Sequence, residues 1–102
     1  MSKRSVGYHE ELIRSLKDPE ERAAYINAAL EEGGVTLLLK ALRNVAEATG
    51  GMTKLSSKTK LARESLYRIF SEKGNPELGS LEKILRSFGL RLSVHPERVH
   101  IA

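Results

Sequence analysis

The sequence predicts an all-α fold, in which five helices are followed by one short C-terminal β-strand. Apolar residues recur every three to four positions over most of the chain, the interval that places them on one face of a helix. Two glycine pairs, Gly33-Gly34 and Gly50-Gly51, and a turn at Gly74-Asn75-Pro76 divide these stretches into segments of helix length. With 102 residues, the chain has room for one hydrophobic core and therefore for one domain.

The first full helix is predicted to begin at Asp18. Asp18 suits the N-cap and Pro19 the first helical position, while Glu21 completes an Asp-x-x-Glu capping box. Before it, Glu10–Leu16 has the apolar spacing of a short amphipathic helix. Residues 1–8 show no clear period, so we expect a frayed lead-in there.

Gly33-Gly34 is predicted to end this helix, with Gly33 in the left-handed conformation of a C-cap. A second helix is expected from about Val35 to Thr49, up to the next glycine pair. The residues expected to face inward on these two helices are Ala23, Ile26, Leu30, Val35, Leu38, Leu39, Leu42, Ala46 and Thr49.

Three shorter helices are predicted after Gly50-Gly51. They are expected over Thr53–Thr59, over about Arg63–Glu72, and from Gly79-Ser80 to Phe88. A break at Lys60-Leu61 separates the first two. The residues expected to face inward are Leu55, Leu66, Ile69, Phe70, Leu81, Ile84, Leu85 and Phe88.

The end of the chain has the pattern of a half-buried strand. Leu90, Leu92 and Val94 alternate with polar residues before Pro96 closes the segment. Because a lone strand is unstable, this one must pair with another. The chain is accordingly divided into an N-terminal helical segment over 1–33, a helix-turn-helix core over 34–90, and the strand and tail over 91–102.

Charge is distributed unevenly along the chain. Residues 1–39 carry five Lys and Arg against seven Asp and Glu, whereas residues 40–91 carry eleven against five. An acidic front and a basic middle indicate two partners on two faces, with nucleic acid as the natural partner of the basic part. The alternative is that the lysines and arginines only keep a helical surface soluble.

Several classes of function are disfavoured. The absence of cysteine excludes disulfides and thiolate metal sites and suits a reducing cytoplasm. No apolar run approaches the roughly 20 residues of a membrane span, and no signal peptide is evident. His9, His95 and His100 lack metal-like spacing, and no glycine loop ends in Gly-Lys-Ser/Thr. We therefore expect a cytoplasmic protein that is not an enzyme and needs no cofactor or metal.

The segment Lys54–Phe70 is predicted to bind double-stranded DNA. A recognition helix buries one face on its own domain and presents the other to the major groove. Arginine matches the two acceptors of guanine, glutamate accepts from the cytosine amino group, and serine contacts bases or phosphates. The candidates for reading bases are Arg63, Glu64, Ser65 and Arg68. The candidates for contacting phosphates are Thr53, Lys54, Lys58, Thr59, Lys60 and Tyr67.

Each of these residues also has a structural interpretation. Tyr67 could be a core aromatic whose hydroxyl reaches solvent. Arg68 and Glu64, four residues apart, could pair with each other on the surface. Lys58 and Lys60 could serve solubility alone.

Five segments together carry a resemblance to a known family: Tyr25–Glu32, Gly51-Met52, Arg63–Arg68, Gly74-Asn75-Pro76 and Gly89–Leu92. The chain resembles, from about Leu12 to Val94, the addiction-module antidote family. That family is similar to the HigA-type antitoxins and belongs to the XRE/Cro (lambda repressor-like) class of helix-turn-helix proteins. The segment Arg63–Arg68 followed by Gly-Asn-Pro is specific as a combination, whereas either piece alone is weak.

The resemblance implies a prokaryotic, nucleoid-associated antitoxin that represses its own operon and neutralises a small basic toxin of the RelE/ParE type. Its partners would be operator DNA, the toxin, and a second copy of the chain. The N-terminal segment or the C-terminal strand would form the dimer or toxin interface. Two departures concern the turn: Lys60 stands where glycine is usual, and Ala62 where a serine-type cap is usual.

Two alternatives share the same sequence features. A solitary XRE-family repressor would use the same recognition helix without a toxin partner. A protein-interaction module would carry the basic face with no role in DNA binding.

Overall fold

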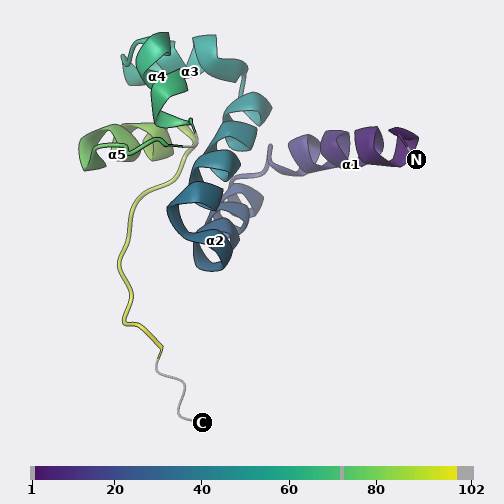
Figure 1. The fold of residues 1–102 in the computed structure, drawn as a ribbon, viewed down its shortest axis with the longest axis horizontal. Coiled ribbons are helices and arrows are strands. Elements are labelled where there is room, and N and C mark those ends of the chain that lie inside the picture. Colours follow the sequence, from purple (N-terminus) through teal and green to yellow (C-terminus); the bar gives the residue numbers. More distant parts are fainter. Residues whose placement is uncertain (1, 72, 99–102) are drawn as a thin grey trace.

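The computed structural model describes residues 2–71 and 73–98, with side chains from Gly7 onward. The described residues are all-helical, as predicted (Figure 1). Five helices follow one another: α1 (Ser2–Ser15), α2 (Pro19–Ala48), α3 (Gly51–Thr59), α4 (Arg63–Ile69) and α5 (Leu78–Ser87). Among these residues, no helix is long and apolar enough to cross a membrane.

Helix α1 corrects the prediction of a frayed lead-in, because it begins at Ser2 and runs to Ser15. The helix passes through Gly7, a residue that costs roughly 1 kcal/mol relative to alanine in a helix interior. Because of this glycine and the lack of an apolar period, the sequence does not predict a helix over these first two turns. The predicted cap at Asp18 is confirmed, since its carboxylate accepts a hydrogen bond from the Glu20 amide at 3.1 Å.

Helix α2 is a helical hairpin. Its ladder is interrupted at Gly34, where φ is 63° and ψ is −148°. The amide of Asn44 donates a hydrogen bond of 2.8 Å to the Tyr25 hydroxyl, and Figure 1 shows the two halves of α2 beside each other. In a straight helix these two residues would lie about 28 Å apart. The break predicted at Gly33-Gly34 is therefore present, with Gly34 rather than Gly33 in the positive-φ conformation.

One hydrophobic core joins all five helices. Leu16, at the end of α1, and Ile26 in α2 belong to the same buried cluster as Leu66 in α4 and Phe88 after α5. The second half of α2 crosses the centre of this cluster and supplies Leu38, Leu39, Ala41, Leu42, Val45 and Ala46. Two predicted inward residues are instead exposed next to the hairpin turn, Leu30 by 46% and Val35 by 54%.

The prediction of a strand at Leu90–Val94 is wrong for the single chain. The structure has no strand among residues 2–71 and 73–98, and residues 90–98 follow α5 as an irregular segment (Figure 1). A strand requires a second strand for its backbone hydrogen bonds, and every other described element is a helix. The alternation of apolar and polar residues is therefore real, but residues 2–71 and 73–98 of the single chain offer it no partner strand.

Candidate nucleic-acid interface

Helices α3 and α4 pack against each other across a three-residue turn, residues 60–62. Side chains at the end of α3 build this turn. The Ser56 hydroxyl donates to the Leu61 carbonyl at 2.6 Å. The Thr59 hydroxyl donates to the Leu55 carbonyl at 2.8 Å and accepts from the Leu61 amide at 3.2 Å. The angle between α3 and α4 is thus fixed by hydroxyl groups as well as by packing.

Lys60 occupies the left-handed position of this turn, with φ 64° and ψ 18°. It is the one described non-glycine residue with positive φ. A side chain in this conformation costs roughly 1–2 kcal/mol. Ala62 follows as the N-cap of α4 and forms no side-chain cap. Both unusual residues noted in the sequence therefore lie at the positions where they weaken the turn.

Helix α4 has one buried face and one open face. Leu66 and Phe70 are buried, and Ile69 packs against the core beside them. The opposite side carries the exposed Glu64 and Arg68, with Tyr67 exposed at its edge; Arg63 is exposed at the start of the helix, and Ser65 is half-buried. The structure therefore brings the four candidates for reading bases together on one short helix.

In the structure, Arg68 does not pair with Glu64 and Tyr67 is not in the core, so neither has the purely structural role that the sequence allowed. Arg68 donates from Nη2 to the Ser65 hydroxyl at 3.4 Å, and no ion pair joins it to Glu64 in the described part of the chain. Tyr67 is 46% exposed, so it is not a core aromatic. Both side chains are accessible from the open side of α4.

The six candidates for phosphate contact do not share one surface. Thr53 and Lys60 are exposed near the two ends of α3, and Tyr67 lies on α4. Thr59 is only 4% exposed, and its hydroxyl is engaged within the turn. Thr59 therefore supports the turn and offers no group to a ligand.

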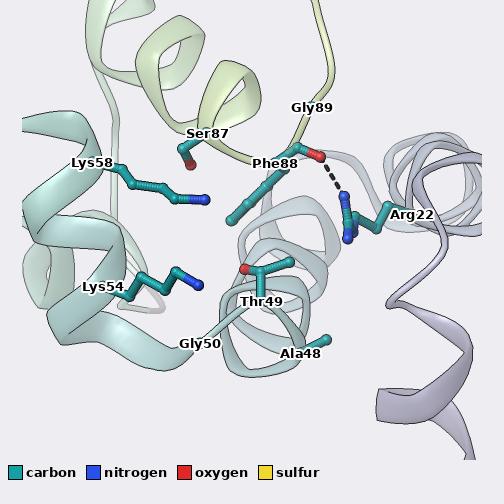
Figure 2. Close-up of a pocket in the computed structure, with 9 residues that line it drawn as sticks. All are labelled: Arg22, Ala48, Thr49, Gly50, Lys54, Lys58, Ser87, Phe88 and Gly89. Atoms are coloured by element: carbon teal, nitrogen blue, oxygen red, sulfur yellow. Dashed lines mark hydrogen bonds between the residues drawn. The ribbon is translucent and has the colours of Figure 1, made fainter.

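Lys54 and Lys58 point into a cleft on another side of α3 (Figure 2). The cleft, of about 530 Å³, lies between α3, Arg22 and the C-terminal ends of α2 and α5; its remaining lining residues are Ala48, Thr49, Gly50, Ser87, Phe88 and Gly89. No residue of α4 lines it. Cations are stabilised near helix C-termini, which carry partial negative charge, so this position gives both lysines a structural role. Their contact with phosphate stays a prediction.

Two features of this region were missed from the sequence. Lys73 and Asn75 are exposed in the loop that follows α4 and therefore extend its polar surface. The sequence predicts a turn and supports the family resemblance at Gly74-Asn75-Pro76, but it does not indicate that the loop adds to the surface of α4. Arg22, which borders the cleft, gave no signal because a single arginine in a helix has no characteristic spacing.

Comparison with known proteins places the chain in a family. A family model described as probable addiction module antidote protein matches residues 9–96. A protein of Haemophilus influenzae, described as uncharacterized, is 30% identical over 88 residues, which cover 86% of this chain and 90% of the relative. No solved structure gives a significant match. The matched region includes all of α2, α3, α4 and α5. The chain belongs to the family of probable addiction module antidote proteins.

Proposed function

We propose that this protein is the antitoxin of a type II toxin–antitoxin module and that it represses its own operon by binding operator DNA. In this proposal α3 and α4 form a helix-turn-helix of the XRE/Cro, HigA-like type. The observation that carries it is the division of α4 into a buried face at Leu66 and Phe70 and an open face with Arg68, next to a helix start at which Arg63 is exposed. Membership of the antidote family supports the same conclusion.

The open face of α4 enters the major groove in this proposal. Arg63 and Arg68 pair with guanine, Glu64 accepts from cytosine, and Ser65 bonds to a base edge or phosphate. Thr53, Lys60 and Tyr67 contact the sugar-phosphate strand at the edges of the same surface. Two copies of the chain would set two copies of α4 about 34 Å apart, on successive turns of a near-palindromic operator.

The N-terminal helices are proposed to bind the toxin. All seven carboxylates of the N-terminal segment, residues 1–33, are exposed: Glu10, Glu11, Asp18, Glu20, Glu21, Glu31 and Glu32. Exposed apolar side chains lie among them, with Tyr8 71% and Val35 54% accessible. A toxin that acts as a ribonuclease must attract RNA phosphates and needs a basic surface, so an acidic surface with apolar contacts is complementary to it.

A salt titration tests the DNA-binding part of this proposal. The chain is titrated against its own promoter fragment and against a scrambled fragment at several salt concentrations. We expect preference for the promoter, and a log–log plot of affinity against salt with a steep negative slope. Equal, weak binding to both fragments would leave the chain as a protein-interaction module.

Co-expression tests the toxin-binding part separately. The product of the adjacent open reading frame is produced with and without this chain, and growth and co-purification are measured. We expect growth arrest that this chain relieves by forming a stable complex. A promoter-binding chain that neither binds nor relieves its neighbour would instead be a solitary repressor.

A further inference from the structure

The C-terminal segment, residues 90–98, has the sequence of a strand and lacks a second strand (Figure 1). The Leu90 amide donates to the Leu85 carbonyl at 2.9 Å, which is the last backbone hydrogen bond of the described chain. From Arg91 to Arg98 the backbone groups have no partner within the described residues. Val94 is 96% exposed and Leu92 is 42% exposed.

The same segment borders an apolar groove on the body of the protein. Leu90 and Leu92 line it together with Ile26 and Leu30 of α2 and Leu85 of α5. The groove has a volume of about 680 Å³. Arg91, Ser93 and His95 of the segment also border this groove, whereas Val94 does not and is almost fully exposed.

We propose that residues 90–98 pair in antiparallel fashion with the same segment of a second copy, with Val94 opposite Val94. The two segments form a two-stranded ribbon that holds the dimer together. The apolar faces of both strands, carrying Leu92 and Val94, cover the groove at Leu30. This inference assigns the dimer surface that the proposed function requires, but it rests on the segment itself and not on DNA binding.

Charge complementarity selects the register. When Val94 faces Val94, Arg91 lies opposite Glu97 of the second copy, and Ser93 lies opposite His95. Both polar pairs occur twice by symmetry, and opposite charges facing each other stabilise an antiparallel pair. A register centred on Ser93 would instead place Arg91 opposite His95, which leaves the arginine without a carboxylate partner.

Pro96 fits the same register. Proline has no N–H to donate, so it must occupy a non-hydrogen-bonded pair of the ladder. With Val94 facing itself, Pro96 lies opposite Leu92, two residues from the centre. Pairs two residues apart belong to the same type, so Val94–Val94 is also a non-hydrogen-bonded pair, with the two Cα atoms about 4.5 Å apart. The amides of Arg91, Ser93 and His95 lie in the alternating hydrogen-bonded pairs and can donate across the ribbon.

The length of the ribbon suits a dimer on DNA. Each copy's helices join the ribbon at Gly89. In this register the two Gly89 residues lie ten residue positions apart along the ribbon. At the rise of an antiparallel strand, this offset corresponds to about 34 Å. Successive major-groove sites on one side of DNA are also about 34 Å apart. The ribbon therefore sets the two points where the bodies join it about one turn of the double helix apart.

Single cysteine substitutions test the register directly, because the chain contains no cysteine of its own. Val94→Cys in the full chain is expected to form a covalent dimer under mild oxidation, since the distance between its two Cα atoms lies in the disulfide range. Leu92→Cys is the matched control. It is also exposed, but in this register it lies opposite Pro96 and should cross-link at least about tenfold more slowly.

A charge exchange tests the polar pairs without any cross-link. Arg91→Glu is expected to raise the dimer dissociation constant about 2- to 30-fold, because two symmetric pairs become repulsive. Adding Glu97→Arg to the same chain should restore the dimer. The dissociation constant is measured by sedimentation equilibrium in the absence of DNA and toxin.

Three results would overturn the ribbon: a full chain that sediments as a monomer at every concentration, equal cross-linking of Val94→Cys and Leu92→Cys, or a dimer that ignores both charge changes. Cross-linking of Val94→Cys to a co-expressed toxin instead of to itself would also overturn it. Because these measurements contain no DNA, a ribbon dimer that fails to bind the promoter contradicts only the proposed function. A monomer that binds the promoter contradicts only the ribbon.

Discussion

Arg22 donates a hydrogen bond of 2.6 Å from Nη1 to the carbonyl of Phe88, across 66 positions of the chain (Figure 2). The same guanidinium donates from Nε to the Leu16 carbonyl at 2.7 Å and from Nη2 to the Lys17 carbonyl at 2.9 Å. One side chain thus joins the end of α1, the start of α2 and the end of α5. The planar fork of arginine allows these three bonds at once, and the single ammonium of lysine does not reproduce them.

Replacement of Arg22 is therefore expected to be costly. Arg22→Ala should lower the free energy of unfolding by about 2 kcal/mol, because three carbonyls lose a charged donor. Arg22→Lys should recover only part of this loss. Urea denaturation measures both. Arg43→Ala, an exposed arginine on the same helix, is the control and should change stability by less than about 0.5 kcal/mol. A loss equal to that of the control would show that the Arg22 bonds contribute nothing.

The hairpin in α2 predicts opposite effects for two glycine-to-alanine substitutions. Gly34 has φ 63° and ψ −148°, a conformation that essentially only glycine adopts, so Gly34→Ala should destabilise the fold by about 1–3 kcal/mol. An added Cβ meets no atom within 4 Å at either Gly34 or Gly7, so steric overlap does not distinguish them. Gly7→Ala, inside α1, should stabilise by about 0.5–1 kcal/mol. Thermal unfolding of the two variants compares these signs; a neutral Gly34→Ala would mean that the chain can reverse without this conformation.

Lys60 allows backbone strain to be separated from charge. Lys60→Gly removes both and should raise stability by up to about 1 kcal/mol, whereas Lys60→Ala removes the charge and keeps the strain. If Lys60 contacts a phosphate, both variants should reduce the salt slope of DNA binding by about one unit. Chemical denaturation and salt titration of the two variants provide the comparison. Lower stability for the glycine variant than for the alanine variant would argue against strain at this position.

Arg68 is the sharpest test of base reading. Arg68→Ala should cost about 1–3 kcal/mol of promoter affinity and relax the preference for one base pair. Arg86→Ala removes an equally exposed arginine from α5 and serves as the control for lost positive charge. Affinities for the promoter and for single-base variants of it are compared by fluorescence anisotropy. Equal losses for the two variants would reduce Arg68 to a general electrostatic contribution.

Local signals predicted most of the helical framework. The Asp18-Pro19 start, the glycine breaks and the helical spacing of Leu38 and Leu42 are short-range patterns, and the structure follows them. The helix before Tyr8 has no such pattern, and the exposure of Leu30 depends on where the hairpin turns. These features depend on tertiary packing between segments that are distant in the sequence, and a local sequence pattern does not show such packing.

The open face of α4 could be predicted because one period of a helix decides which side is buried. Once Leu66 and Phe70 face the core, Glu64 and Arg68 must face away from it, whereas Arg63 is exposed because it is the first residue of the helix. The placement of the preceding lysines could not be predicted in this way. Lys54 and Lys58 acquire their surroundings from Arg22 and the end of α5, which are distant in sequence. The burial of Thr59 likewise depends on a hydroxyl network that appears only when the turn is built.

The shared core also determines how a protease would degrade the protein. Leu16 and Ile26 belong to the N-terminal helices, yet they are buried with Leu66 and Phe88 in one cluster. A small domain with one core opens as a unit, so the segment 1–33 and the α3–α4 region are lost together when the chain unfolds. A protease that captures the open chain would then abolish both proposed surfaces in a single event. Operator release and loss of the partner-binding helices would share one half-life, which is set by the stability of this core.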